Sequence, residues 1–276
     1  MTSSTIFSVI TFGYLLSWVL YLCYMVFRQE TLGRLASVTA WLFWAMQTGG
    51  FAIRWIESYR LGIGKPPLTN LYESMVFFSW SIILLYLLFE LRHRTLTMGA
   101  VAVPFGFGAM AYASLAPNIS NQIQPLVPAL QSDWLLAHVI TCFLGYAAFA
   151  ISCGVSILYV IQERRTNPGG SSHIPSLSVL DDWIYKSIAV GFPLLTAGII
   201  TGAAWAYSAW GAYWSWDPKE TWSLITWLIY AAFLHARFTR GWQGKKAAFL
   251  SIVGFLAVIF TYLGVNLILS GLHSYT

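Results

Sequence analysis

Positions 210–220 read Trp-Gly-Ala-Tyr-Trp-Ser-Trp-Asp-Pro-Lys-Glu and stand between two long apolar segments. Tryptophan and tyrosine favour a membrane surface, because the ring can be buried while its N–H or O–H stays hydrated. A location at the membrane surface explains two or three of these aromatic residues but not their density. A wall of indole rings beside a helix start would also suit a large planar apolar ligand with anionic edges, such as a porphyrin. We call residues 208–222 the tryptophan-rich segment.

The end of this segment predicts the start of a helix. Asp217 suits the N-cap position, Pro218 suits the first helical position, and Glu220 follows the cap by three residues. Helix capping is one complete explanation of the two acidic residues. The alternative explanation is that both acids lie at the edge of a bound ligand, and the sequence does not decide between the two explanations.

Composition places the chain in a membrane. Of its 276 residues 58% are hydrophobic and only 9% are charged, and the mean hydropathy is +0.65, which excludes a soluble protein. We predict an all-α integral membrane protein that forms a single domain over residues 1–276, without internal repeats. Eight transmembrane helices are expected, at about 5–27, 35–56, a third ending near 90, 96–116, 133–162, 183–207, 222–237 and a last ending near 270.

The positive residues predict the orientation of these helices. Eleven of the 15 lysines and arginines fall on one side of the predicted topology, and the other four are Arg54, Arg60, Lys65 and Lys219. The side with more positive residues faces the cytoplasm. Both termini and the tryptophan-rich segment are therefore expected outside, together with His138 and His273, whereas His235 approaches the inner side.

The three cysteines exclude two kinds of chemistry. Cys23, Cys142 and Cys153 all lie in apolar segments, without a Cys-x-x-Cys or Cys-x-x-Cys-His motif. The chain therefore carries neither a thiol-exchange motif nor a covalent haem site of its own. Cys142 follows His138 by one helical turn, and we interpret it as a small buried packing residue.

Two histidines on different predicted helices flank the tryptophan-rich segment on the outer side. Imidazole nitrogen is a common axial ligand of haem iron, and two imidazoles on opposite faces give a six-coordinate site. His138 and His273 are therefore the candidate ligands.

His235 is a separate candidate. It follows Trp222 by 13 residues, about 20 Å along a helix, which places it in the inner part of the hydrocarbon core. An ionisable residue at that depth is a functional candidate, and Ala231 and Ala232 would leave room for a flat ligand. A histidine near the lipid headgroups beside Arg237 is the alternative, which the sequence does not exclude.

The pattern Trp-Gly-x-x-Trp-x-Trp-Asp-x-x-Glu resembles the "WWD" signature of haem-handling proteins in cytochrome c biogenesis. It is formed here by Trp210, Gly211, Trp214, Trp216, Asp217 and Glu220. Several families share this signature, including CcsA (ResC), CcmC and CcmF. Three further segments resemble CcsA: residues 67–74, residues 134–138 around His138, and residues 270–275 around His273. The length and the eight predicted helices also fit CcsA better than the longer CcmF or the shorter CcmC.

This resemblance implies a haem-handling subunit of a cytochrome c synthase, which is a cytochrome c haem lyase. His138 and His273 would hold haem b (iron protoporphyrin IX) at the outer face, for thioether attachment to the Cys-x-x-Cys-His motif of apocytochrome c. A CcsB (ResB) type partner would complete a second haem site with His235. The membrane would be the bacterial cytoplasmic membrane or a thylakoid membrane. We expect no general acid–base pair and no nucleic-acid partner.

Two other functions remain open at this stage. One is a haem exporter or chaperone without ligation activity, and the other is a b-type respiratory cytochrome subunit. An electron-transfer cytochrome typically pairs histidines at both membrane faces, and this chain offers one pair outside and a single histidine inside. That count argues against an electron-transfer cytochrome. A haem exporter and a synthase need the same haem site, so the sequence does not distinguish between them.

Overall fold

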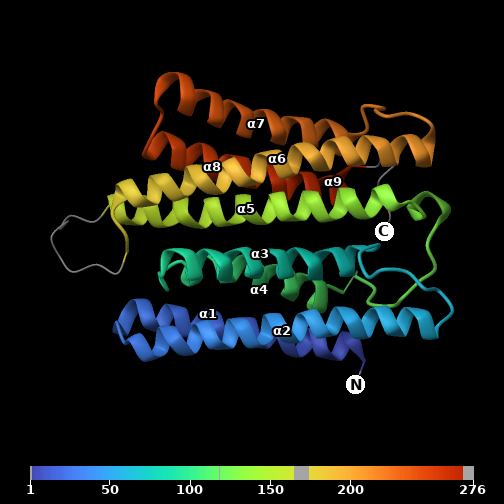
Figure 1. The fold of residues 1–276 in the computed structure, drawn as a ribbon, viewed down its shortest axis with the longest axis horizontal. Helices are drawn as coiled ribbons and strands as arrows, with labels where there is room; N and C mark the ends of the chain where they lie inside the picture. Colours follow the sequence, from blue (N-terminus) through green and yellow to red (C-terminus); the bar gives the residue numbers. More distant parts are fainter. Residues whose placement is uncertain (1, 118, 165–173, 270–276) are drawn as a thin grey trace. The chain divides into compact units, whose positions relative to one another are not determined.

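The computed structural model of the protein describes residues 2–117, 119–164 and 174–269, and within these ranges it contains helices but no β-strand (Figure 1). The predicted all-α class is thus confirmed. The helices form two compact units, Met1–Gln131 and Ser132–Thr276. The single domain expected for residues 1–276 stays a prediction.

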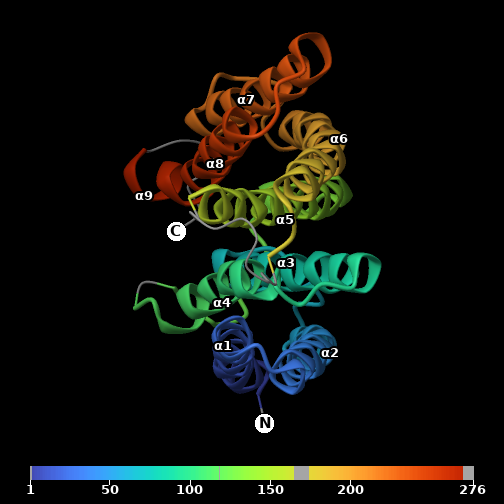
Figure 2. The same ribbon diagram turned by 90° about the vertical axis from the view of Figure 1, so that its left-hand side faces the viewer.

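The first unit contains four long helices and one short 3₁₀ turn. They are α1 (Ser3–Phe27), α2 (Glu30–Arg60), α3 (Leu71–His93), α4 (Gly99–Leu115) and η1 (Pro128–Leu130). Helix α1 packs against α2 and α4, and α3 packs against α4 (Figure 2). Buried polar contacts join these helices: the Tyr14 hydroxyl donates to Gln47 at 2.5 Å, and the Tyr21 hydroxyl donates to Glu90 at 2.8 Å. Between apolar helices such bonds specify which faces meet.

The second unit contains α5 (Asp133–Glu163), α6 (Leu177–Trp210), α7 (Pro218–Arg240), α8 (Lys245–Ile259), a single π-helical turn η2 (Phe260–Gly264) and α9 (Val265–Ile268). Helices α5 and α6 pack most extensively. They approach so closely that a Cβ atom on Gly145 would lie 3.1 Å from the Gly191 carbonyl oxygen. Glycine therefore permits the backbone contact that positions one helix on the other.

Among the residues that the structure describes, five stretches of helix are long and apolar enough to cross a membrane: α1, α3, α5, α6 and the run Lys245–Ile268. Helix α4 is apolar but has only 17 residues, which is near the lower limit for a span. Helices α2 and α7 are long enough but less apolar, because tryptophan, threonine and charged residues occupy much of their length. All eight predicted segments are helical, and the number of membrane crossings stays a prediction.

The helix boundaries extend beyond the predicted apolar cores. Helix α2 covers residues 30–60 instead of 35–56, and α6 covers 177–210 instead of 183–207. Hydropathy marks the part of a helix that suits hydrocarbon, whereas backbone hydrogen bonding continues through polar turns. The last predicted span is not one continuous α-helix, because the π-helical turn η2 separates α8 from α9.

Candidate functional site

The tryptophan-rich segment ends in a complete helix cap. Asp217 is the N-cap of α7: its side chain accepts from the Lys219 backbone N–H at 2.9 Å, and the Glu220 carboxylate accepts from the Asp217 N–H at 3.2 Å. Glu220 also accepts from the Ser215 N–H at 2.7 Å. Both carboxyl groups are buried. The predicted capping is confirmed, and an additional role of these two acids in binding a ligand stays a prediction.

Two unusual backbone conformations shape the segment. Gly211 ends α6 with φ of +79°, a left-handed conformation that glycine adopts without steric cost. Trp216 has φ of +60°, which is uncommon for a residue with a large side chain. Backbone strain of this kind is concentrated at functional sites. Here it directs an indole ring outward, since Trp216 is 69% exposed.

Two aromatic residues of the segment, Tyr213 and Trp216, are exposed, and Trp214 is half-buried. The Trp214 and Trp216 rings lie 5.7 Å apart and nearly perpendicular, and Tyr213, which is 59% exposed, stacks on Tyr207 at 4.4 Å. A monomeric structure exposes large aromatic rings at an energetic cost unless lipid or a ligand covers them. The segment is therefore a surface that suits a flat apolar molecule.

His138 lies on α5 and is held in one orientation by α6. Its Nδ1 atom lies 2.7 Å from the Gly198 carbonyl oxygen. A carbonyl can only accept, so Nδ1 carries the hydrogen and Nε2 carries the lone pair that binds a metal. Histidines that ligate metals in proteins are commonly oriented by such a bond to a backbone carbonyl.

Aromatic contacts connect His138 to the tryptophan-rich segment. The His138 ring lies almost parallel to the Trp205 ring, with 6.0 Å between centroids and 17° between planes. Trp205 in turn contacts Trp210, the last residue of α6, at 4.9 Å. Two ring contacts thus connect an oriented imidazole to Trp210, and the binding site expected from the sequence stays a prediction. These residue types fit haem, which needs an imidazole ligand for iron and an apolar surface for the porphyrin face.

Gly202 makes the position of His138 possible. A Cβ atom on Gly202 would lie 2.6 Å from His138 Nδ1 and 2.8 Å from its Cε1, closer than real contacts allow. From the haem-ligand role that the WWD resemblance implies for His138, we predict that Gly202→Ala displaces the imidazole, breaks its bond to Gly198, and lowers haem attachment roughly 10-fold, the worth of one buried hydrogen bond. Co-expression with an apocytochrome, scored for covalent haem, measures the effect. Gly108→Ala is the control, because a Cβ atom there meets nothing within 4 Å; equal activity of the two variants would contradict the prediction.

The other two predicted ligands are His273 and His235. His273 lies outside the described residues. His235 is exposed near the end of α7, 18 residues after the Asp217 cap and therefore about 27 Å along the helix. Its side chain is not part of the His138 site, as expected. Cys142 is buried one turn from His138, with its Sγ 3.6 Å from Nδ1, which agrees with the predicted packing role.

In the first unit, the segment 67–74 forms a buried ion cluster. The Glu73 carboxylate accepts from Arg54 Nε at 2.9 Å, lies 3.7 Å from Lys65 Nζ, and accepts from the Thr69 N–H at 2.9 Å. Arg54, Lys65 and Glu73 are each less than 5% exposed. Burial lowers the pKa of Lys65, and the Glu73 carboxylate acts in the opposite direction. The cluster joins the end of α2 to the start of α3.

Asn70 is the N-cap of α3, because its side chain accepts from the Glu73 N–H at 2.8 Å. The Glu73 side chain, however, bonds the backbone of Thr69 and the Arg54 guanidinium, not the Asn70 backbone that a capping box would use. Arg54, counted above as one of the outer positive residues, is a buried residue of α2.

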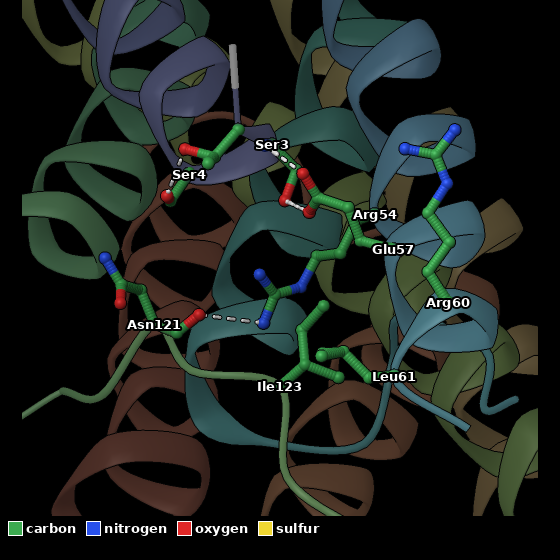
Figure 3. Close-up of a pocket in the computed structure, with 9 residues that line it drawn as sticks. Ser3, Ser4, Arg54, Glu57, Arg60, Leu61, Asn121 and Ile123 are labelled. Carbon is green, nitrogen blue, oxygen red and sulfur yellow. Dashed lines mark hydrogen bonds between the residues drawn. The ribbon is translucent and has the colours of Figure 1, made fainter. Parts of the chain in front are cut away.

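A hollow of about 300 Å³ lies beside this cluster (Figure 3). Arg54 Nη2 donates to the Asn121 carbonyl at 3.1 Å on one side of it, and Glu57 accepts from the backbone and side chain of Ser3 on the other. Arg54 therefore also holds the backbone at Asn121, and Glu57 holds the start of α1.

Comparison with known proteins adds to this geometry. A family model described as "Cytochrome C assembly protein" matches residues 68–273. The cytochrome c biogenesis protein CcsA of Chlamydomonas reinhardtii is 45% identical over 227 residues, covering 81% of this chain and 63% of that protein. CcsA of Pyropia yezoensis is 40% identical over 284 residues and 88% of each chain, and CcsA of a Synechococcus strain is 41% identical over 254 residues. The chain belongs to the CcsA family.

The solved structure of a protein titled "Cytochrome c Heme Lyase CcmF" resembles this CcsA-family chain with a TM-score of 0.71 at 20% identity. The match covers 95% of this chain and 47% of CcmF. At this identity the likeness shows a shared fold and does not transfer an activity. It agrees with the shared WWD signature, and the family predicted from the sequence is confirmed.

Sequence reasoning missed contacts within each of the two units of this CcsA-family protein. In the second unit, Gly198 and Gly202 have the four-residue spacing of small residues at close helix contacts, so a signal was present. Trp205 carried no such signal, because its ring partner His138 lies on another helix. Arg54 and Glu73 could be noticed as charges near apolar segments, but their pairing required the fold.

Proposed function

We propose that this chain is the haem-handling subunit of a cytochrome c synthase, which presents haem at the outer membrane face for thioether attachment to apocytochrome c. The observation that carries the proposal is His138. A backbone carbonyl of α6 orients its ring, and Trp205 connects it to Trp210, the first residue of the WWD signature. Membership of the CcsA family supports the same conclusion.

The reaction needs little acid–base chemistry from the chain. Haem and the apocytochrome are the substrates: each of two cysteine S–H groups adds across a haem vinyl group, so that one C–S bond forms and the hydrogen passes to the other vinyl carbon. The chain supplies orientation, which alone can account for a large part of a rate enhancement. In this role His138 and His273 hold the iron, and Trp210, Trp214 and Trp216 cover the porphyrin face.

We further propose that all eight long helices cross the membrane, with both termini outside. This topology follows from the 11 positive residues on one side and four on the other, and it places the tryptophan-rich segment outside. Because Arg54 and Lys65 are both buried beside Glu73, they contribute little to this bias, and the remaining 11-to-2 ratio gives the same orientation. The membrane would be a bacterial cytoplasmic membrane or a thylakoid membrane.

His235 is proposed as half of a second haem site, completed by a histidine of a CcsB (ResB) type partner. It is exposed on α7, and the exposed Ala232 beside it leaves space for a flat ligand. We predict that His235→Ala lowers haem content at the outer site as well, because it blocks supply from the inner side. Absorption spectra of the purified two-subunit complex measure haem content. His93→Ala, at the end of α3 in the first unit, is the matched histidine control. Full haem occupancy in His235→Ala would leave only a role near the lipid headgroups for His235.

Co-expression of the chain with a CcsB-type partner and an apocytochrome tests the proposed function. We expect covalently bound haem on the apocytochrome, and none when its two motif cysteines are replaced by alanine. Haem that reaches the outer side without thioether formation would instead identify an exporter. Reversible electron transfer without either result would identify a respiratory cytochrome subunit.

A further inference from the structure

The ion cluster beside the hollow of the first unit carries more positive than negative charge. Two buried positive residues, Arg54 and Lys65, share the single carboxylate of Glu73. All three side chains are less than 5% exposed, so water compensates little of the second positive charge. Burial lowers the pKa of Lys65, and the nearby Arg54 acts in the same direction. The cluster therefore favours the approach of one further anion.

The guanidinium group of Arg54 has one donor nitrogen that the protein does not use. Its Nε donates to Glu73 and its Nη2 donates to the Asn121 carbonyl. Its Nη1 makes no hydrogen bond to any atom of residues 2–117, 119–164 or 174–269. Arg54 lines the hollow, and Figure 3 shows its guanidinium group directed toward Asn121. A charged donor that is buried without an acceptor is unfavourable, so an acceptor in the hollow would complete the hydrogen bonding of Arg54.

The other carboxylate at the hollow, that of Glu57, does not supply this acceptor. Glu57 accepts from the Ser3 backbone N–H at 3.0 Å and from the Ser3 hydroxyl at 2.5 Å, at the start of α1. Within the described part of the chain Glu57 forms no ion pair with Arg54 or Arg60. Arg60 is exposed and lines the same hollow. Two guanidinium groups are therefore available to an anion, and guanidinium is well suited to phosphate.

The surface beside the hollow suits the headgroup region of a membrane. Trp55 and Tyr59 lie near the end of α2 and are 47% and 63% exposed. Exposed tryptophan and tyrosine rings favour the level of the lipid headgroups. Leu61, which is 62% exposed, and Ile123 both line the hollow. The hollow thus combines positively charged donors with apolar side chains, a combination that an amphiphilic anion fits better than a soluble one.

We propose that the hollow binds the phosphate of an anionic phospholipid such as phosphatidylglycerol. In this site Arg54 Nη1 donates to a phosphate oxygen, Arg60 adds a positive charge at the rim, and Leu61 and Ile123 contact the apolar part of the lipid. The charge of the lipid compensates the positive excess of the cluster. The volume of about 300 Å³ is at the lower end of the range for small-molecule sites, which suits a headgroup rather than a whole lipid. All these residues belong to the first unit, and the proposal is independent of the proposed haem-handling function.

Thermal unfolding of the purified, delipidated chain in detergent tests this proposal. The probes are short-chain phosphatidylglycerol, short-chain phosphatidylcholine and inorganic phosphate. A ligand that binds only the folded protein raises Tm as its concentration increases. We expect phosphatidylglycerol to raise Tm at concentrations at which the other two probes have little effect. Arg60→Gln should require about 5-fold more of this lipid, the worth of an exposed charge pair.

Two further variants test the interior of the site. Ile123→Trp places a large ring in the hollow, and Arg54→Met/Glu73→Gln removes the Arg54 donor together with its buried partner. Each should require at least about 10-fold more phosphatidylglycerol, as for the loss of one hydrogen bond to a charged group. Arg34→Gln is the matched control, because it removes an exposed arginine near the other end of α2. It should respond to the lipid as wild type does.

Three results would overturn the proposal. One is a wild-type response in both Ile123→Trp and Arg54→Met/Glu73→Gln, which would show that the lipid does not bind in the hollow. Another is a loss in Arg34→Gln as large as that in Arg60→Gln, which would show a general effect of surface charge. The third is equal stabilisation of the wild-type chain by phosphatidylcholine or by inorganic phosphate, which would exclude a site for an anionic lipid.

Discussion

Replacing His138 with alanine should abolish covalent attachment of haem to the apocytochrome while the chain still folds and inserts. Among the residues that the structure describes, His138 is the candidate iron ligand that ring contacts connect, through Trp205, to the tryptophan-rich segment. Misplacement of a reacting group by about 1 Å can already cost 100-fold in rate, and loss of the ligand should cost at least as much. The yield of covalent haem after co-expression with the partner and an apocytochrome measures this effect.

The spectrum of the purified variant distinguishes a lost ligand from a lost fold. His138→Gly should bind haem in a five-coordinate form that added imidazole converts to the six-coordinate form. Phe substituted for Trp205 keeps an aromatic ring beside the imidazole and should retain most of the activity. If His138→Ala shows the wild-type spectrum and normal attachment, His138 is not an axial ligand and the proposed site is wrong.

The features that the sequence predicted are those that depend on neighbours within a few residues. Asp217, Pro218 and Glu220 form the expected cap, because capping is decided within one helical turn. The eight helices follow from long apolar segments, because a membrane requires every backbone polar group to be satisfied within the helix. The family signature is equally local, since its six residues lie within eleven positions.

The features that the sequence could not predict depend on contacts between distant residues. The orientation of His138 depends on Gly198, 60 residues away, and the contact between Lys219 and Asn266 spans 47 residues. Hydropathy predicts that two helices are buried, but not which faces meet. No residue composition is typical of a π-helical turn. The pairing of Glu73 with Arg54 depends on how α2 and α3 pack against each other.

Replacing Arg54 with methionine should destabilise the first unit more than any single surface change. Arg54 and Glu73 are 2% and 1% exposed, and Nε lies 2.9 Å from the carboxylate. Removal of the guanidinium leaves a buried carboxylate with Lys65 at 3.7 Å as its nearest remaining positive group. Breaking a buried pair from one side costs about 3–5 kcal/mol, because the surviving charge has lost its compensation. The hydrogen bond to Asn121 is lost as well.

The exposed pair Lys186–Asp182 provides the control. Its atoms are closer, at 2.6 Å, yet its side chains are 60% and 45% exposed. Water screens such a pair, so Lys186→Met should cost less than about 1 kcal/mol. Thermal unfolding in detergent, followed by tryptophan fluorescence, should show a large shift for Arg54→Met and almost none for Lys186→Met. Burial, and not distance, sets the cost of breaking each pair. The double variant Arg54→Met/Glu73→Gln should recover much of the lost stability, because it also removes the buried negative charge that Arg54→Met leaves without its main partner. A double variant that is as unstable as the sum of its single changes would show that the two side chains do not act as a pair.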